Sequence, residues 1–205
     1  MKNAAAAINR VPAVNLFLIV SFVVIYAVGA EKDSIFTSLS FSPSLFFDRL
    51  AFWRIISYAF LHYDFFHLAA NTVFIYIFGN DLEMEIGHRQ YFLLFISASA
   101  ASVLFYSFFN SRSSIPIIGA SGAISAIVAG YIYYFAAQKI RYFRLDPFVH
   151  HFSKIFILLF VAIWFVIQYI DSIMAFTDKT DTGWLIHIGG FMYGLLFSAI
   201  FSRKY

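Results

Sequence analysis

The sequence predicts an all-α fold: a polytopic membrane protein with six transmembrane helices and a first loop that lies in the membrane interface. The chain has 205 residues, of which 61% are hydrophobic and only 12% are charged. Soluble domains are usually about 45–50% apolar and about a quarter charged. The mean hydropathy is +0.79, and apolar runs recur along the whole chain. Because so few polar side chains cannot cover the molecule, lipid must cover part of it.

The apolar runs have the lengths expected of membrane spans. The first, 11–30, has about the 20 residues needed to cross a hydrocarbon core of about 30 Å. A cleaved signal peptide has a shorter apolar region of about 7–15 residues, so we expect a retained helix. Residues 31–58 mix aromatic and charged side chains around Pro43, which indicates an interfacial loop or short helices. The remaining predicted spans are 64–79, 91–109, 115–137, 155–175 and 184–201, and together residues 1–205 form a single integral membrane domain.

Six spans place both ends of the chain on the same side of the membrane. Of the 14 Lys and Arg residues, nine lie in the segments on that side and five lie on the other. This bias predicts cytoplasmic termini. The short loops and the absence of a recognisable transit peptide favour the bacterial inner (cytoplasmic) membrane. The net charge of +3 does not indicate nucleic-acid binding, because the basic residues lie in short loops beside apolar runs.

Several classes of site are excluded by composition. The chain has no cysteine, so it has no disulfide, thiolate metal site or cysteine nucleophile. It has no H-E-x-x-H motif, and we expect neither a metal nor a cofactor. An intramembrane aspartyl protease needs two aspartates within its spans, and only Asp171 lies inside one. A small transporter or channel is a less favoured class, because it would more often show paired charges or broken helices within its spans, and apart from Asp171 the span interiors have no acidic or basic residue.

Polar residues recur at the start of three alternate spans. His67, Ser121 and His187 lie near the starts of the second, fourth and sixth predicted spans, which all run in the same direction. At 1.5 Å per residue, each lies roughly 6–8 Å below the outer surface. A lone serine in a membrane helix is usually a packing residue, and a lone histidine there is often structural. Their common depth favours a shared functional site.

Small residues at helical spacing predict which helices meet. Gly122, Ala126 and Gly130 form a stripe on the fourth span, and Gly190, Gly194 and Ser198 form one on the sixth. Such stripes let helix backbones approach closely. Because Ser121 adjoins the first stripe and His187 lies one turn before Gly190, the sequence predicts a contact between Ser121 and His187.

The second span offers two further polar side chains. His67 and Asn71 are four residues apart and therefore share one helix face. Together they could donate hydrogen bonds to a developing oxyanion. His62 is off this helical repeat and is expected in the preceding loop, while His88, His150 and His151 are expected in loops on the opposite side.

At these residues the chain closely resembles the rhomboid family of intramembrane serine proteases. Residues 119–122 match the family's G-x-S-G motif, and His67 with Asn71 match H-x-x-x-N. The last span carries H-x-x-G-x-x-x-G, and residues 53–54 match the W-R of the first loop. Glu83 sits where the family often carries a glutamate. The resemblance covers about residues 11–202, and its motif residues in the spans are Gly119, Ser121, Gly122, His67, Asn71, His187, Gly190 and Gly194.

The resemblance implies a serine endopeptidase with a Ser–His dyad that cleaves membrane-spanning proteins near the outer face. Ser121 would be the nucleophile and His187 the general base and then acid. His67, Asn71 and the Ser121 backbone N–H would form the oxyanion hole. Segment 177–183 and Tyr169 would belong to the family's cap and gate. The alternative is a catalytically weak rhomboid-like protein that binds membrane clients.

One departure from the family pattern concerns the catalytic histidine. Some members carry an aromatic residue one turn after the nucleophile, beneath the histidine, and here this position is Ser125. Something else must then orient His187. The expected partners are the lipid bilayer and membrane-spanning protein substrates, with no nucleic acid, and the sequence makes no prediction of the oligomeric state.

Overall fold

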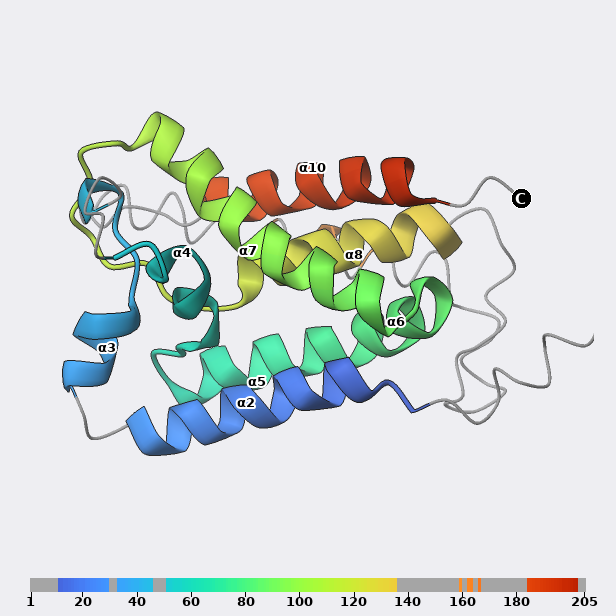
Figure 1. The fold of residues 1–205 in the computed structure, drawn as a ribbon, viewed down its shortest axis with the longest axis horizontal. Helices are drawn as coiled ribbons and strands as arrows, with labels where there is room; N and C mark the ends of the chain where they lie inside the picture. Colours follow the sequence, from blue (N-terminus) through green and yellow to red (C-terminus); the bar gives the residue numbers. More distant parts are fainter. Residues whose placement is uncertain are drawn as a thin grey trace, which may run out of the picture.

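The computed structural model describes residues 11–29, 33–45, 51–135 and 184–202, together with residues 159, 162, 163 and 166. Over these ranges the regular structure is helical, as predicted, and an isolated antiparallel bridge joins Phe41 to Ile117. Figure 1 shows the arrangement. The elements are α2 (Ala13–Gly29), α3 (Asp33–Leu39), the 3₁₀ turn η1 (Pro43–Leu45), α4 (Arg54–Ser57), the 3₁₀ turn η2 (Tyr58–Phe60), α5 (Phe65–Phe74), the π-helical turn η3 (Ile75–Gly79), α6 (Asn80–Ile86), α7 (His88–Phe109), α8 (Ser121–Phe135) and α10 (Trp184–Phe201).

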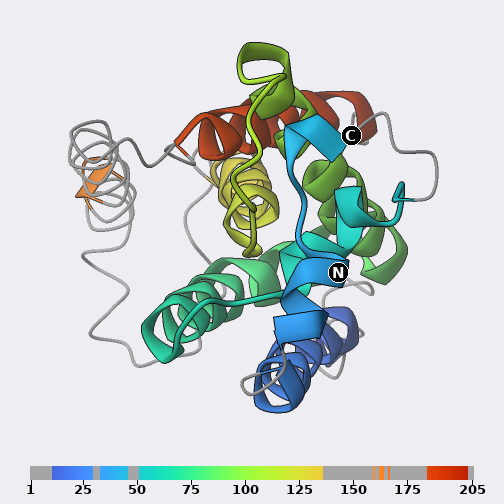
Figure 2. The ribbon, with the colours of Figure 1, turned by 90° about the vertical axis from the view of Figure 1, so that its left-hand side faces the viewer.

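Helix α8 lies at the centre of the described molecule. Eleven of its 15 residues are buried, and it contacts α7, α10, η3 and α6. Both views show α8 beneath α10, with α2 and α5 side by side on the opposite flank (Figures 1 and 2). The first turns of α8 consist mainly of small residues, so neighbouring backbones can approach it from several sides.

The two small-residue stripes pack against each other as predicted. A Cβ atom added to Gly190 would lie 2.8 Å from the carbonyl carbon of Gly122. One turn further along, a Cβ atom added to Gly194 would lie 2.5 Å from the Cα of Ala126. Only glycine leaves room for α10 to pass this close to the backbone of α8.

The second helix extends beyond its predicted end. We expected the span to close at Gly79, with a polar connection over residues 80–90. Instead α5 continues through η3 and α6 to Ile86, and Gly87 alone separates α6 from α7. Hydropathy marks where the apolar part of a helix ends, whereas residues 82–85 are good helix formers and carry the helix on. His88 is accordingly the first residue of α7 and not a loop residue.

The fourth helix begins later than predicted. The apolar run starts at residue 115, but α8 begins at Ser121. Pro116 cannot donate a backbone hydrogen bond, and Ile117 instead exchanges two with Phe41: Phe41 N to Ile117 O at 3.1 Å and Ile117 N to Phe41 O at 2.6 Å. Helices α2, α7 and α10 agree closely with the predicted spans. The predicted fifth span 155–175, Tyr169 and segment 177–183 lie outside the described residues, apart from the four single positions named above.

The first loop contains short helices that are fastened to one another. Trp53 Nε1 donates to Ser38 O at 3.2 Å, and Arg54 Nη1 donates to Ser40 O at 3.0 Å. Ser57 Oγ donates to Leu39 O at 2.8 Å. The Trp53–Arg54 pair and the helical turn that follows it thus hold α3 and its C-terminal residues against α4.

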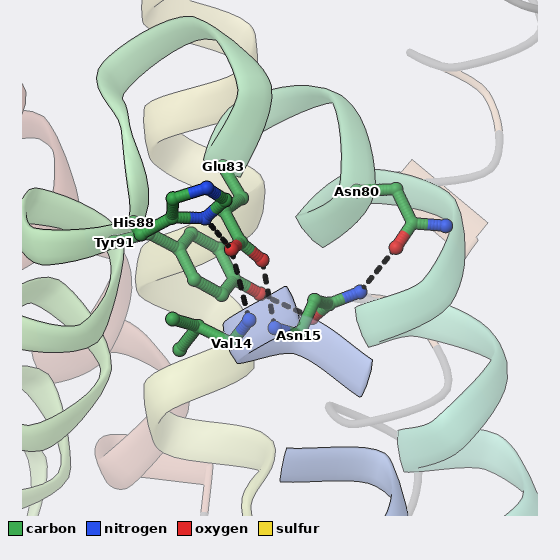
Figure 3. A network of polar contacts seen from close by, with 6 residues as sticks. All are labelled: Val14, Asn15, Asn80, Glu83, His88 and Tyr91. Carbon is green, nitrogen blue, oxygen red and sulfur yellow. Dashed lines mark hydrogen bonds and ion pairs between the residues drawn. The ribbon is translucent and has the colours of Figure 1, made fainter. Parts of the chain in front are cut away.

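The start of α2 is held by a buried carboxylate. Glu83 of α6 is fully buried and accepts hydrogen bonds from Val14 N at 2.9 Å and Asn15 N at 2.7 Å. These belong to the backbone N–H groups that a helix leaves unpaired at its N-terminus, where negative charge is also favourable. His88 Nδ1 contacts the same carboxylate. Figure 3 shows this arrangement.

Asn15 completes what we call the capping network, formed by Val14, Asn15, Asn80, Glu83, His88 and Tyr91 (Figure 3). Its Nδ2 donates to Asn80 Oδ1 at 2.7 Å and to Ile75 O at 2.9 Å, and its Oδ1 accepts from the Tyr91 hydroxyl. Ile75 opens the π-helical turn, whose widened hydrogen bonding leaves a carbonyl available for this contact. The network therefore joins α2 to η3, α6 and α7.

The outward faces of the helices are apolar. Phe17 of α2 is 60% exposed, and Leu196 and Ile200 of α10 are 57% and 65% exposed. Two described helices, α7 and α10, have the length and apolar composition of a membrane span, and α2 and α8 are apolar but shorter. Large exposed apolar faces of this kind are typical of surfaces that contact lipid.

Candidate active site

Ser121 and His187 meet between α8 and α10. The His187 Nε2 lies 2.7 Å from the Ser121 Oγ, and the histidine is 7% exposed. Ser121 is the first residue of α8, and His187 lies in the first turn of α10. With Nδ1 carrying the ring proton, Nε2 accepts a hydrogen bond from the serine hydroxyl. This is the geometry in which an imidazole can remove the proton of a nucleophile.

Close helix packing brings the two side chains together. A Cβ atom added to Gly122 would lie 2.7 Å from Ile186 Cγ2 and 2.8 Å from Ser102 Oγ, so α10 and α7 both press on the first turn of α8. Ser125, which stands where some family members have an aromatic ring, donates its Oγ hydrogen bond to Ser121 O at 2.7 Å. The contact between α8 and α10 therefore sets the position of His187.

The segment before Ser121 is fixed by backbone hydrogen bonds. Ile117 pairs with Phe41, and Gly119 N donates to Tyr58 O at 3.0 Å. Tyr58 is fully buried and its hydroxyl donates to Ser99 O at 2.8 Å, which ties this segment to α7. Gly119 has φ +110, a conformation that favours glycine.

Gly119 is also the point at which α5 reaches the serine. A Cβ atom added to Gly119 would lie 2.6 Å from Cε1 and Nε2 of His67 and 3.8 Å from Asn71 Nδ2. Asp64 fixes the start of α5 because its side chain accepts a hydrogen bond from His67 N at 2.8 Å. His67 and Asn71 then lie on the helix face that points to Gly119, two residues before Ser121.

Asn71 carries a donor without an acceptor. The residue is 5% exposed, and its Nδ2 is buried with no hydrogen-bond partner among the residues that the structure describes. Leaving such a group unpaired costs about 1–3 kcal/mol.

We name His67, Asn71, Ser121 and His187 the serine cluster. Because the first N–H groups of α8 have no partner within the helix, the cluster combines a hydroxyl, a base and several donors at one place.

The structure places His187 against Ser121 and places His67 and Asn71 against Gly119, two residues before Ser121. Gly119, Gly122, Gly190 and Gly194 are the positions at which a side chain would block the assembly. Within the described ranges, no three His, Asp or Glu side chains are grouped so as to hold a metal ion. Sequence reasoning missed Tyr58 and underrated His62, which lies in the expected loop but is buried. The only sequence feature that could have indicated Tyr58 or His62 is a polar ring within an apolar stretch.

The apolar helix faces together with the Ser121–His187 contact are typical of a helical membrane protein with a serine–histidine site. A family model described as "Rhomboid domain" matches residues 49–204. This is more than half of the chain, and it includes every residue of the serine cluster. The chain belongs to the rhomboid family, and it is accordingly an integral membrane protein.

Individual relatives are similar over different shares of the chain. "Rhomboid protease GlpG" of Klebsiella pneumoniae is 23% identical over 184 residues, which cover 89% of this chain and 59% of the relative. "Rhomboid protein 1, mitochondrial" of Saccharomyces cerevisiae is 31% identical over 93 residues, 43% of this chain and 27% of the relative. "RHOMBOID-like protein 1" of Arabidopsis thaliana is 27% identical over 149 residues, 73% of this chain and 34% of the relative. The matched segments thus span less than two thirds of these relatives.

Proposed function

We propose that this protein is an intramembrane serine endopeptidase. The observation that carries the proposal is the 2.7 Å contact between His187 Nε2 and Ser121 Oγ, beside the half-buried His67 and the buried Asn71 of α5. Family membership and a relative that is named a protease support the same reaction class. The alternative, a weak rhomboid-like protein that binds clients, has no comparable observation in its favour.

In the proposed mechanism, Ser121 Oγ attacks the scissile carbonyl carbon while its proton passes to His187 Nε2. The carbonyl oxygen becomes an oxyanion, which accepts hydrogen bonds from the Ser121 backbone N–H and from the side chains of His67 and Asn71. The intermediate collapses as Nε2 protonates the leaving amine. Water, deprotonated by His187, then hydrolyses the acyl-enzyme and restores the serine.

The proposed substrates are membrane-spanning proteins cut near the outer face of the membrane. Six spans in one domain over residues 1–205, with termini in the cytoplasm of a bacterium, would place the serine cluster toward that face. A helical substrate hides its carbonyl groups in its own hydrogen bonds, so we expect cleavage where Gly, Pro or polar residues weaken the helix. Substrates whose cleavage region is replaced by Leu and Ala should resist.

Cleavage of a single-span substrate by purified protein in detergent tests the proposal. Ser121→Ala should abolish cleavage, whereas Ser125→Ala is a matched control, because that serine lies one turn further along the same helix and donates only to a backbone carbonyl. Equal cleavage by wild type and Ser121→Ala would contradict the proposal. Absence of cleavage by wild type, with specific binding of the substrate, would favour the client-binding alternative.

A further inference from the structure

His62 is a buried histidine next to the serine cluster, and the mechanism above gives it no role. It lies in the connection between η2 and α5 and is 1% exposed. Its ring packs against Phe22 of α2, with ring centroids 5.1 Å apart. On another side it packs against His67, with centroids 5.2 Å apart and the rings inclined at 71°, an edge-to-face arrangement.

This position is costly for a histidine. Both ring nitrogens are buried, and neither makes a well-aligned hydrogen bond with a described residue; the Phe60 backbone offers only a weak one. The pKa of His62 is lowered to about 4, mainly by burial and also by the nearby His67, against a smaller opposing effect of a hydrogen bond with the Phe60 backbone. His62 is therefore uncharged at neutral pH. An unpaired buried polar group costs about 1–3 kcal/mol, so an apolar side chain would suit the packing better.

The contacts of His62 lead directly to the proposed oxyanion donors. The His67 ring contacts the His62 ring and also approaches Gly119: a Cβ atom added to Gly119 would lie 2.6 Å from Cε1 and Nε2 of His67. The terminal torsion of a histidine is broad, so packing must fix the direction of its ring. A donor stabilises an oxyanion only within about 2.7–3.1 Å, and a loosely held ring would leave that range.

We propose that His62 is a positioning residue, which holds the His67 ring in the orientation needed to donate to the oxyanion. Edge-to-face ring contacts are attractive and depend on direction, so they can fix a ring that backbone geometry alone leaves free. His62 itself touches neither the substrate nor the reacting atoms. The proposal rests on the proposed function, because it assigns His67 the part of an oxyanion donor.

A double-mutant cycle tests this role. His62→Leu fills the space without a ring, and His62→Phe keeps a ring at the same place. We expect His62→Leu to lower kcat about tenfold with little change in KM, because a misplacement of about 1 Å can cost up to about 100-fold. His62→Phe should restore kcat to within about threefold of wild type. Both variants should keep the wild-type Tm or exceed it, since they remove the unpaired nitrogens.

Making His62→Leu in wild type, in His67→Ala and in Asn71→Ala distinguishes a positioning role from a general effect on stability. In His67→Ala, His62→Leu should change kcat less than twofold, because the residue through which it acts is gone. In Asn71→Ala, the control on the same helix face, the loss should again be about tenfold. Equal losses in all three backgrounds, or no loss in the wild type, would overturn the proposal. If His62→Leu does not fold, His62→Gln serves the same cycle with the same expected losses.

A second measurement is independent of proteolysis. In protein with isotope-labelled histidine, His62→Leu should broaden or double the NMR signals of the His67 ring, and His62→Phe should return a single set. Unchanged His67 signals in His62→Leu would overturn the positioning role even if the enzyme is active. If Ser121→Ala cleaves as wild type does, the proposed function fails, and the His67 signals still decide whether His62 orients that ring.

Discussion

The serine cluster and the capping network are built from similar side chains, but their hydrogen bonding differs. Each contains a buried asparagine and a histidine. In the capping network, Asn15 donates through Nδ2 to two acceptors and accepts from Tyr91. In the serine cluster, Asn71 Nδ2 is buried with no partner in the described part of the chain. In the first arrangement the asparagine amide is paired on both sides, whereas in the second it keeps an unused donor.

This difference indicates what each region contributes. A protein interior rarely leaves a polar group unpaired, and each exception needs an explanation. In the capping network the polar groups bind one another. The Glu83 carboxylate accepts from the backbone N–H groups at the start of α2, and the Asn15 side-chain amide donates to Ile75 O of η3. The unpaired Asn71 donor of the serine cluster is explained if the substrate supplies its acceptor. We therefore expect substitutions in the capping network to change stability and substitutions in the serine cluster to change activity.

The largest expected effect separates the two histidines. His187→Ala should lower kcat/KM by about 10⁴-fold or more, because the serine loses its base. His88→Ala should change it less than about twofold, since Glu83 keeps its two backbone donors. Steady-state kinetics with one substrate measures both. Comparable losses for the two variants would break the distinction between the regions.

The two asparagines give a smaller contrast. Asn71→Ala should lower kcat about 10²-fold without lowering Tm, because it removes an unpaired donor. Asn15→Ala leaves the Ile75 carbonyl and the Tyr91 hydroxyl without this partner, and should lower the free energy of unfolding by about 2–4 kcal/mol. Its kcat per folded molecule should stay near wild type. Thermal unfolding and kinetics on the same preparations check both; a stability loss confined to Asn71→Ala would reverse our assignment.

The smallest effect concerns Asp81, a half-buried carboxyl next to Asn80 of the capping network. Burial raises the pKa of Asp81 to about 6 from 3.8, with Tyr131 nearby. A carboxyl with a raised folded pKa destabilises the protein when charged, so stability should rise as the pH falls from about 6 to about 4. Asp81→Asn should raise Tm by about 2–4 °C at pH 7.5 and leave it unchanged near pH 4. A lower Tm at pH 7.5 would contradict this.

The sequence predicted the parts of the fold that depend on side-chain periodicity. The small-residue stripes that contain Gly122 and Gly190 predicted that α8 packs on α10. From that packing we predicted the contact between Ser121 and His187. The four-residue spacing of His67 and Asn71 predicted that they share one face of the helix. These inferences succeed because helix geometry fixes them locally.

The remaining features depend on long-range contacts that periodicity does not report. The π-helical turn within the second helix gives Asn15, 60 positions away, a carbonyl to bind at Ile75, and no spacing in the sequence indicates this contact. Residues 115–120 are extended because Ile117 pairs with Phe41, 76 positions away. His62 was expected only in a loop, and nothing in its spacing indicated the contacts with Phe22 and His67.

Covalent labelling of Ser121 tests the difference between the two regions most directly. Purified protein treated with a fluorophosphonate, which reacts only with activated serines, is digested and analysed by mass spectrometry. We predict a label on Ser121, its loss in His187→Ala, and its retention in His88→Ala. Absence of label from Ser121 in the wild type, or equal labelling with and without His187, would contradict the account.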